Sequence, residues 1–526
     1  MNKNVKIMLK CAVLIAAVTG VVACKTGPEY ERPALDMPDG YKSAAAHEHS
    51  QQDVDREWWR LFQDPELDRL CEHALEGNLG LKSAMARVAQ ARASVLSVKS
   101  GFYPVVTAGA SATRSGTPAQ TILNDTDKLS EVSSALGQVT SLLGAANTVA
   151  QGEIPSTGAA GSSQVSATGM GVSSNVSNSF RIPFDLSYEI DIWGRVQHSY
   201  EQAHAEAQAT VYEYEVVRQT LLADIARNYF TLRLLDTQQR ILSQNLALYA
   251  EQAQLTRQQY EAGLVNETNA LQAEIQLEAT RAQAADTDRQ RANTEHAIAI
   301  LTGCAPADFA LAVKPLEAAL PAIPTGLPAE LLCRRPDIAA AEQSLIAACA
   351  GIGVAQAEFY PSIKLMGSAG LQSAKIEDVI DWQSRSWSIG PSISIPIFKG
   401  GQLKANLQQA KARYEESEFS YRETILGAFQ DVEDSLTDIA ARTAEYEARA
   451  KAVEAAREYL RLTKIQYESG MIDYLHVITA EQTLMSNELS EAQIINDRLA
   501  ATVLLIKAIG GGWDMDTISQ EENAFL

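Results

Sequence analysis

The sequence contains little of what marks enzymes and metal proteins. Its seven histidines are scattered, none of its cysteines forms a Cys-x-x-Cys pair, and it has no glycine-rich phosphate loop with lysine and no nucleophile-elbow motif. These absences argue against a zinc ribbon, a thioredoxin-like site, a nucleotide-binding loop and a serine hydrolase. We therefore expect no catalytic constellation, no cofactor and no metal site.

Basic residues are in the minority. The chain has 44 lysines and arginines against 65 aspartates and glutamates, with a formal net charge of -21. Removal of a lysine-containing leader would make the balance more negative still. So acidic a chain is a poor partner for the phosphate backbone, and nucleic acid is not an expected ligand.

Residues 1–23 are predicted to be a lipoprotein signal peptide. Three lysines among the first ten residues precede an apolar run over 11–22, which is too short to span a bilayer as a helix. The run ends in Val-Val-Ala-Cys at 21–24, which resembles a bacterial lipobox, so Cys24 is expected to be acylated and to become the mature N-terminus. An ordinary signal peptide that happens to precede a cysteine is the alternative. Residues 24–56 then form a polar, lipid-anchored tail.

Four cysteines remain in the mature chain besides Cys24. Cys304 and Cys333 flank a proline-rich stretch and could bridge in an oxidising periplasm. Isolated buried thiols are the favoured state for these two, and also for Cys71 and Cys349.

The chain contains two copies of one pattern. The peptide Gln-Tyr-Glu-Ala-Gly at 259–263 returns as Gln-Tyr-Glu-Ser-Gly at 466–470, and Phe-Tyr-Pro at 102–104 returns at 359–361. The first copy holds about 50 extra residues after its Phe-Tyr-Pro. Two copies are too few for a solenoid, so pseudo-symmetric closure is expected.

Each copy includes two stretches in which apolar and polar residues alternate. The clearest begins at Phe180, and a period of two residues is typical of a strand with one apolar face. We predict strands over about 104–114, 180–193, 361–371 and 387–398, with a long exposed insertion, rich in glycine, serine and alanine, over about 115–179.

The predicted strands have the length of tilted strands that cross a bilayer, which is about ten residues. Aromatic residues stand where the pairs begin and end, as in the girdle of a transmembrane barrel: Phe102, Tyr103, Trp193, Phe359, Tyr360 and Phe398. Pro183, Pro391 and Pro396 weaken this interpretation because proline donates no ladder hydrogen bond, and we expect them at bends where strand gives way to helix. A soluble β-layer that covers the helices is the alternative.

After each strand pair the apolar period changes to 3.5 residues. The pattern steps by four and three from Leu221 to Gly263, whereas Arg442 and Arg449 interrupt the same seam in the second copy. A helix that begins near Arg195 and ends at this glycine would be roughly 100 Å long at 1.5 Å per residue. Such a length indicates a coiled-coil assembly. An ordinary two-stranded coiled coil is the alternative.

These patterns divide the mature chain into two repeats. The divisions are a first repeat over 57–303 with a long helical hairpin at 195–303, a linker or equatorial region over 304–333, a second repeat over 334–513 with a hairpin at 401–510, and a tail over 514–526. Four strands cannot close a barrel, and an open sheet edge in lipid leaves backbone groups unpaired. If the strands span a membrane, the chain must oligomerise, and three protomers would supply twelve strands.

Several motifs together resemble one known family. They are Gly-Pro-Glu-Tyr-Glu-Arg-Pro at 27–33, Arg-Arg-Pro-Asp-Ile at 334–338, the two Tyr-x-x-Gly turns, and Lys-Ala-Ile-Gly-Gly-Gly-Trp at 507–513. The chain resembles the outer-membrane factors of tripartite efflux systems, in the OprM, NodT and CusC lipoprotein branch of the TolC-like superfamily. By the same resemblance, Lys25 after the cysteine favours the outer membrane.

The resemblance implies a fold and a function. The fold would be mainly α with transmembrane β, a homotrimer whose 12-stranded β-barrel is continuous with a long periplasmic α-helical barrel and an equatorial collar. The implied partners are a periplasmic membrane-fusion adaptor, an inner-membrane pump of the RND class and outer-membrane lipid. The protein would be a passive exit duct for drugs or other toxic compounds, without enzymatic activity, that opens at its periplasmic tip when adaptor and pump dock.

The two helix turns would form that tip and its gate. The implied residues are Tyr260, Gly263, Leu264 and Asn269 in the first turn and Tyr467, Gly470, Asp473, Leu475, His476 and Thr479 in the second. Family members often carry aspartates at the positions of Asn269, His476 and Thr479, so this chain departs from an aspartate ring. Leu475 stands where an apolar gate residue is often found, and Glu267 and Asp473 could move the negative charge along the axis.

Two other functions are compatible with parts of the pattern. An exit duct of a type I protein-secretion system shares the fold, although the lipobox and the Gly-Gly-Gly-Trp ending favour efflux. A structural coiled-coil envelope lipoprotein would have no channel and would conduct no ions.

Three copies of His476 close to the axis would make the gate charge depend on pH, because an unperturbed histidine changes its charge between about pH 5 and 8. We expect the channel conductance of the parent to vary over this range, and that of His476→Asn to vary less, in planar bilayers. A parent without pH dependence, or a variant that keeps it, would make His476 an ordinary exposed surface residue.

Overall fold

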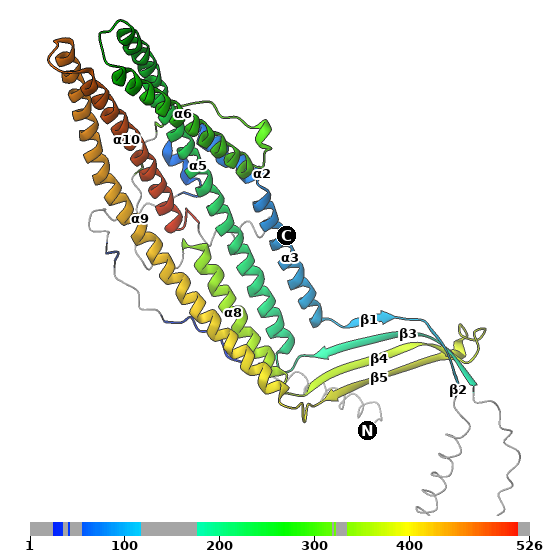
Figure 1. Cartoon of the computed structure of the whole chain (residues 1–526). Coiled ribbons are helices and arrows are strands. Elements are labelled where there is room, and N and C mark those ends of the chain that lie inside the picture. The colour runs from blue at the N-terminus through cyan, green and yellow to red at the C-terminus, as the bar shows by residue number, and fades with distance from the viewer. Residues whose placement is uncertain are drawn as a thin grey trace, which may run out of the picture. The chain divides into compact units, whose positions relative to one another are not determined.

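The computed structural model describes residues 25–34, 40–42, 55–116, 176–317, 320–321 and 334–513. Cys24, Cys333, the tail over 514–526 and most of the insertion over 115–179 lie outside the described residues. The chain divides into two compact units. One consists of strands and comprises Gly101–Asp191 and Pro361–Ile397; the other is helical and comprises the rest (Figure 1).

The strand unit is one antiparallel sheet. Its members are β1 (Val105–Ala108), β2 (Ser111–Gly116), β3 (Val176–Ile190), β4 (Ser362–Ser373) and β5 (Arg385–Ser394). The order is β1-β3-β4-β5, and β2 also pairs with β3. β1 with β2 therefore forms one edge of the sheet and β5 the other.

The pairing register places most of the apolar strand residues on one face. Phe184 of β3 lies opposite Ala108 of β1 and Ala369 of β4, and Ala369 lies opposite Trp387 of β5. The same row continues on either side, with Ile182, Leu186, Tyr188 and Ile190 of β3, Ile363, Leu365 and Leu371 of β4, and Ile389 and Ile393 of β5. Successive side chains of a strand point to opposite faces. The other face is mostly polar, and it carries the ion pair of Lys364 with Glu189 at 3.9 Å.

No residue of the five strands is fully buried. Trp387 is 79% exposed and Ile389 66% exposed, although both belong to the apolar face. A sheet in water would cover such a face against a core. The apolar face is therefore left uncovered by the described residues of this chain.

The first predicted strand, over 104–114, is wrong in one respect. The structure has two strands there, β1 and β2, interrupted at Gly109 and Ala110 opposite Pro183. The N–H of Gly109 donates to the carbonyl of Pro183 at 3.0 Å, but Pro183 has no N–H to return. The pairing of the two strands is therefore interrupted after Ala108 and resumes at Ser111 in the same register.

Two of the three prolines are not at bends between strand and helix, contrary to expectation. Pro183 lies within β3 opposite Gly370 and Pro391 within β5 opposite Leu365, whereas Pro396 follows β5. Gly370 permits the close approach, since a Cβ there would meet the carbonyl oxygen of Ile182 at 2.3 Å.

The helical unit contains two long hairpins. The first pairs α5 (Arg195–Glu261) with α6 (Glu267–Thr302), and the second pairs α9 (Gln402–Glu468) with α10 (Tyr474–Ala508). α5 and α9 have 67 residues each, roughly 100 Å at 1.5 Å per residue. The remaining helices are α2 (Pro65–Gly77), α3 (Leu79–Lys99) and α8 (Pro336–Ala357), with short 3-10 turns η2 (Trp58–Phe62), η3 (Ser100–Phe102) and η4 (Pro306–Asp308). A further turn, η6 (Trp382–Ser384), belongs to the strand unit.

α5 is the central element of the helical unit, because it packs against α3, α6, α8 and α10. The largest core cluster lies around its middle, with Phe230 and Ile225 fully buried against Trp58 and Phe62 of η2. α8 is long and apolar enough to span a membrane, with a mean hydropathy of 1.6, yet 56% of that stretch is buried among its neighbours.

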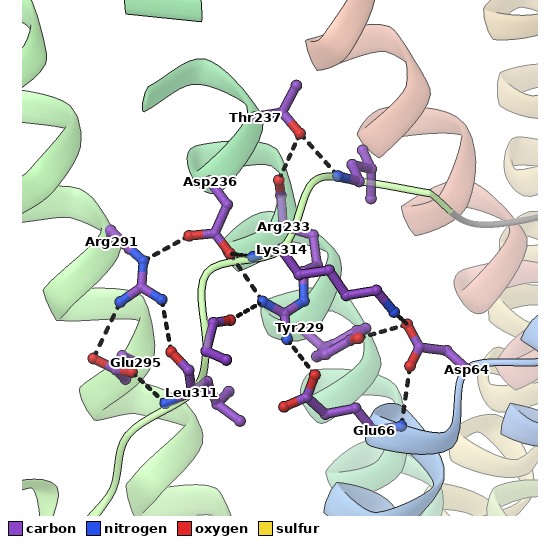
Figure 2. A network of polar contacts seen from close by, with 12 residues as sticks. Asp64, Glu66, Tyr229, Arg233, Asp236, Thr237, Arg291, Glu295, Leu311 and Lys314 are labelled. Atoms are coloured by element: carbon purple, nitrogen blue, oxygen red, sulfur yellow. Dashed lines mark hydrogen bonds and ion pairs between the residues drawn. The ribbon is translucent and has the colours of Figure 1, made fainter. Parts of the chain in front are cut away.

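A polar network lies beside this core and fastens the linker that follows α6 (Figure 2). Arg233 of α5 forms ion pairs with Glu66 at 2.7 Å and Asp236 at 2.9 Å, and Arg291 of α6 pairs with Asp236 at 2.6 Å. The Arg233 and Asp236 side chains are 2% and 0% exposed. Charges this deeply buried persist only when they are paired.

The same side chains bind the backbone of the linker. Arg233 donates to the carbonyl of Ala312 at 2.7 Å, and Asp236 accepts from the N–H of Lys314 at 3.1 Å. Arg291 and Glu295 bind the carbonyl and the N–H of Leu311 at 2.9 and 2.7 Å. The linker is therefore held to α5 and α6 by its backbone, largely independently of its side chains.

Asp64, the N-cap of α2, joins the network on the other side of Tyr229. It accepts from the Tyr229 hydroxyl at 2.5 Å and from the N–H of Glu66 at 3.0 Å. Burial by itself would raise the pKa of Asp64, but these hydrogen bonds outweigh it and lower that pKa.

We expect Arg233→Ala to lower the free energy of unfolding by about 3 to 5 kcal/mol, because Glu66, Asp236 and the Ala312 carbonyl lose their buried partner. The matched control is Arg227→Ala, an exposed arginine of the same helix, which should change it by at most about 0.5 kcal/mol. Thermal unfolding at equal protein concentration measures both. Equal melting temperatures for the two variants would show that the network does not stabilise the unit.

Candidate functional site

The turn between α5 and α6 is built on a glycine. Gly263 adopts a φ of 75°, which residues with a Cβ rarely adopt. Its N–H donates to the carbonyl of Tyr260 at 2.8 Å, and that of Leu264 donates to Gln259 at 2.9 Å. This pair of bonds is a Schellman motif, which satisfies the last carbonyls of the helix.

The turn between α9 and α10 repeats this arrangement. Gly470 has a φ of 70°, its N–H donates to Tyr467 at 2.9 Å, and that of Met471 donates to Gln466 at 3.0 Å. The duplicated peptide therefore ends the long helix in the same way in both copies. The second turn then begins α10 with Asp473, whose carboxylate accepts from the N–H of Tyr474 at 2.7 Å.

Both turns expose apolar side chains. Leu264 is 75% exposed, Met471 66% and Leu475 44%. His476 is exposed on the first turn of α10, with Nδ1 3.3 Å from the carbonyl of Asp473. Thr479 donates to the carbonyl of Leu475 at 2.9 Å and is also exposed.

The predicted residues fall into two sets on separate turns. Tyr260, Gly263, Leu264 and Asn269 belong to the first turn and the start of α6, and the other six to the second turn and the start of α10. Within the second set, the rings of Tyr467 and Tyr474 lie 5.1 Å apart. The role of each residue in a gate stays a prediction, as does the acylation of Cys24.

One polar contact that ties the two hairpins together was missed by the sequence reasoning. Glu481 of α10 has a side chain only 4% exposed and forms an ion pair with Lys464 of α9 at 3.0 Å. Its second oxygen accepts from Gln252 of α5 at 3.2 Å. One carboxylate thus joins three helices, two of the second hairpin and one of the first.

The duplication offered a signal for this contact. Glu481 is the repeat counterpart of Glu274, which is exposed on α6. The two copies therefore differ in the burial and the contacts of this carboxylate. The periodicity of the sequence alone could not predict that Glu481 is buried and Glu274 exposed.

Two tyrosines lie near Glu481. Burial, and then the charge of Glu481, raises the pKa of Tyr249 to about 12, and the same two causes raise the pKa of Tyr474. Glu481 and Tyr474 line a pocket of about 270 Å³ together with Lys464 and Gln252. The carboxylate therefore sits at a small cavity between the hairpins rather than in a packed core.

A second tie lies close by. Gln482 of α10 donates to Gln276 of α6. Both line a groove of about 660 Å³ between the hairpins, together with Arg442 and Arg449 of α9. The arginines that interrupt the apolar seam of the second copy thus face a polar groove.

This arrangement is a set of polar contacts that hold helices together. Among the described residues, no group of three or more histidine, cysteine, aspartate or glutamate side chains could hold a metal ion. Cys71 and Cys349 are buried free thiols, and Cys304 is partly buried.

Comparisons with known proteins agree with this geometry. The outer membrane efflux protein family matches residues 70–304 and 327–511. The outer membrane protein OprJ of Pseudomonas aeruginosa is 30% identical over 511 residues, 96% of this chain and 95% of OprJ. The pyoverdine export outer membrane protein OpmQ of the same species is 30% identical over 504 residues, 96% of this chain and 97% of OpmQ. The solved structure of the outer-membrane channel OprN is 29% identical, with a TM-score of 0.78, and covers 93% of this chain and 100% of that one.

Long helical hairpins in duplicate, each with its strand pair, define a TolC-like channel. The chain belongs to the outer membrane efflux protein family. The expected recognition, the mainly α fold with its strands, the efflux-channel function and the location in the outer membrane with a large periplasmic helical part are confirmed. Membership of a family of transport ducts also confirms the expectation that the protein is not an enzyme.

We expect Glu481→Gln to loosen the second hairpin, because it removes the ion pair with Lys464 and weakens the bond to Gln252. Hydrogen bonds to charged groups contribute about 1.5 to 3 kcal/mol. In planar bilayers, the variant should show a higher mean conductance than the parent.

The matched control is Glu274→Gln, the counterpart position in the first copy, which should conduct like the parent. If the Glu481→Gln channel conducts no more than the Glu274→Gln channel, Glu481 does not contribute to keeping the tip closed.

Proposed function

We propose that the protein is the homotrimeric exit duct of a tripartite efflux pump, anchored by acylated Cys24, joined to a periplasmic adaptor and served by an inner-membrane RND pump. Family members are the outer-membrane components of such pumps. The observation that most strongly supports a duct is the form of the sheet. Within one chain it has one apolar face, one polar face and two open edges.

The open edges support an assembly of copies. β5 pairs with β4 alone, and β1 and β2 pair with β3 alone, among the described strands. Each unpaired backbone group in hydrocarbon costs several kcal/mol, so a membrane sheet must close on itself. β1 and β2 lie end to end along β3 and count as one interrupted strand, so each chain supplies four strand positions. Three copies then close with twelve, an even number as in bacterial outer-membrane barrels.

The tip supports opening by a movement of one hairpin against the other. The ties found near it are few and polar, Gln252 with Glu481 and Gln276 with Gln482. The first tie lies at a small cavity and the second at a groove, so both separate more readily than the packed core around Phe230. Docking of an adaptor to the exposed apolar turns would then favour the open arrangement, and the pump supplies the energy.

The first described residues support an anchor at Cys24. The hydroxyl of Thr26 donates to the carbonyl of Trp193 at 2.8 Å, and its own carbonyl accepts from Nε2 of His198 at 2.7 Å. Lys25 pairs with Glu201 at 2.9 Å. The chain is thus fixed to α5 immediately after the residue that would carry the lipid.

The relatives support small-molecule export. OpmQ is named for export of pyoverdine, and this chain matches it almost from end to end. This observation favours an efflux duct over a duct for secreted proteins. It does not assign pyoverdine or any other single compound to this chain.

The test is a deletion strain in which the intracellular accumulation of dyes, antibiotics and metal ions is measured together with the secreted proteins. We expect higher accumulation of at least one compound with an unchanged set of secreted proteins, and restoration by the intact gene. A missing secreted protein with normal accumulation would instead assign the duct to type I secretion. No change in either would contradict a transport role.

A further inference from the structure

Two arginines lie on the apolar face of the sheet. Arg385, the first residue of β5, is directly opposite Leu371 of β4. Arg114 of β2 is directly opposite Asn178 of β3, which is two residues from Phe180 on the same strand. Residues directly opposite each other share a face of a sheet, and so do residues two apart on one strand. Both arginines therefore share a face with the apolar side chains.

The arginines come where the apolar part of this face ends. In β3 the face is apolar from Ile190 to Phe180, and in β5 from Ile393 to Trp387. At about 3.3 Å per residue and a tilt of about 40°, the stretch in β3 spans roughly 25 Å, which is the height of the apolar band of an outer-membrane barrel. The next position on this face of β5 is Arg385.

The arginines belong to the strand ends at the outer leaflet. The opposite ends of β3 and β5 are the ones that continue along the chain into α5 and α9. Because the helical part of these channels is periplasmic, the ends that carry Arg114 and Arg385 are directed to the outer surface of the membrane.

Neither guanidinium is neutralised by a carboxylate of the described residues, in which Arg114 and Arg385 form no ion pair. Nε of Arg385 donates instead to the carbonyl of Trp382 at 2.6 Å, and the guanidinium carbon lies 3.3 Å from the centre of that indole ring. These contacts fix the side chain and use one of its five N–H groups. The other four N–H groups are available to an anion.

The connection between β4 and β5 exposes apolar side chains at the same end of the sheet. Ile380 is 85% exposed, Trp382 74% and Ile376 68%. Tryptophan is enriched at the level of lipid headgroups, where its apolar ring meets hydrocarbon and its N–H meets polar groups. Trp382 therefore places the guanidinium that it holds at a membrane surface.

Three exposed carboxylates also lie in this connection, those of Glu377, Asp378 and Asp381. They oppose the binding of anions from solution, which would meet them beyond the strands. The arginines belong to the strands themselves and lie on the face that the apolar side chains form. A membrane lipid presents its phosphates from that side, so the arrangement favours a lipid over a soluble anion.

The two arginines stand at opposite edges of the sheet. Within one chain, β3 and β4 separate β2 from β5. In a closed ring of copies, the β5 edge of one protomer meets the edge of β1 and β2 of the next, and neighbouring strands lie about 4.8 Å apart. Arg385 of one protomer and Arg114 of the next would then lie on the two sides of one seam.

We propose that these two arginines bind the phosphate groups of an outer-leaflet glycolipid at each seam of the barrel. The proposal rests on the trimeric outer-membrane duct proposed above. Arginine binds phosphate oxygens with pairs of N–H donors, and such charge-assisted bonds are among the strongest in proteins. A guanidinium beside hydrocarbon is costly unless it is paired, and a lipid phosphate is the partner that the membrane supplies. A lipid that bridges two copies also stabilises their association.

The test is native mass spectrometry of the full-length protein in mild detergent with added lipid A, a phosphorylated glycolipid, or with dephosphorylated lipid A. The double variant Arg114→Gln/Arg385→Gln should raise the apparent Kd for lipid A roughly tenfold, because hydrogen bonds between charged groups are lost. Binding of the dephosphorylated lipid should not change. If the double variant does not assemble, Arg385→Gln alone replaces it, with an expected rise of about threefold.

The matched control is Arg181→Gln. Arg181 of β3 is exposed at the same end of the sheet but lies on the polar face, opposite Ser111 and Gln372. Its replacement removes the same charge from the other side of the sheet. The control should therefore bind lipid A with the Kd of the parent.

The outcomes separate this proposal from the proposed function, because each spectrum also gives the number of chains. A parent trimer whose binding of lipid A is unchanged in the double variant, or equally weakened by Arg181→Gln, overturns the site and leaves the duct intact. A parent that binds phosphatidylglycerol as tightly as lipid A overturns the assignment to a glycolipid. A parent that is a single chain contradicts the trimer itself. A loss confined to the double variant and to the phosphorylated lipid supports the proposal.

Discussion

The backbone hydrogen bonds at the two edges of the sheet constrain the rest of the structure. β5 on one side and β1 with β2 on the other offer donors and acceptors that lipid cannot satisfy. In the proposed assembly further copies of the chain pair them, so that the sheet face that carries Trp387 and Ile389 would turn to lipid and its polar face would enclose a pore. The long helices of a single chain are then parts of a wall, and this accounts for their many half-exposed residues.

The two copies in the chain have diverged around this common frame. The linker after α6 is fastened by Arg233, Asp236 and Arg291, whereas the second copy carries Ala440 and Thr443 at the positions of Arg233 and Asp236. Conversely, the second copy buries Glu481, whose counterpart Glu274 is exposed. The first hairpin is thus fixed by a buried network, and near the tip the second is tied to it by polar contacts beside cavities. This difference between the hairpins is compatible with a duct in which the second hairpin moves while the first stays fixed.

Much of the fold was predictable because the periods in the sequence are local. Alternation from Phe180 and the heptads from Leu221 report directly on strand and helix, and the duplicated glycines report on the turns at Gly263 and Gly470. The break opposite Pro183 was not predicted, because it depends on which residue the register places across the ladder. The burial of Glu481 and the linker network also escaped prediction. Each depends on helices that lie far apart in the sequence, and the gate residues rest on resemblance alone.

The most direct test of the central claim is the mass of the purified, full-length protein in detergent, measured by native mass spectrometry. Closure of the open sheet edges by neighbouring copies predicts a complex of three chains that dissociates to single chains only when heated or denatured. A folded, monodisperse single chain in mild detergent would contradict the account, because its sheet edges would then be stable without a partner.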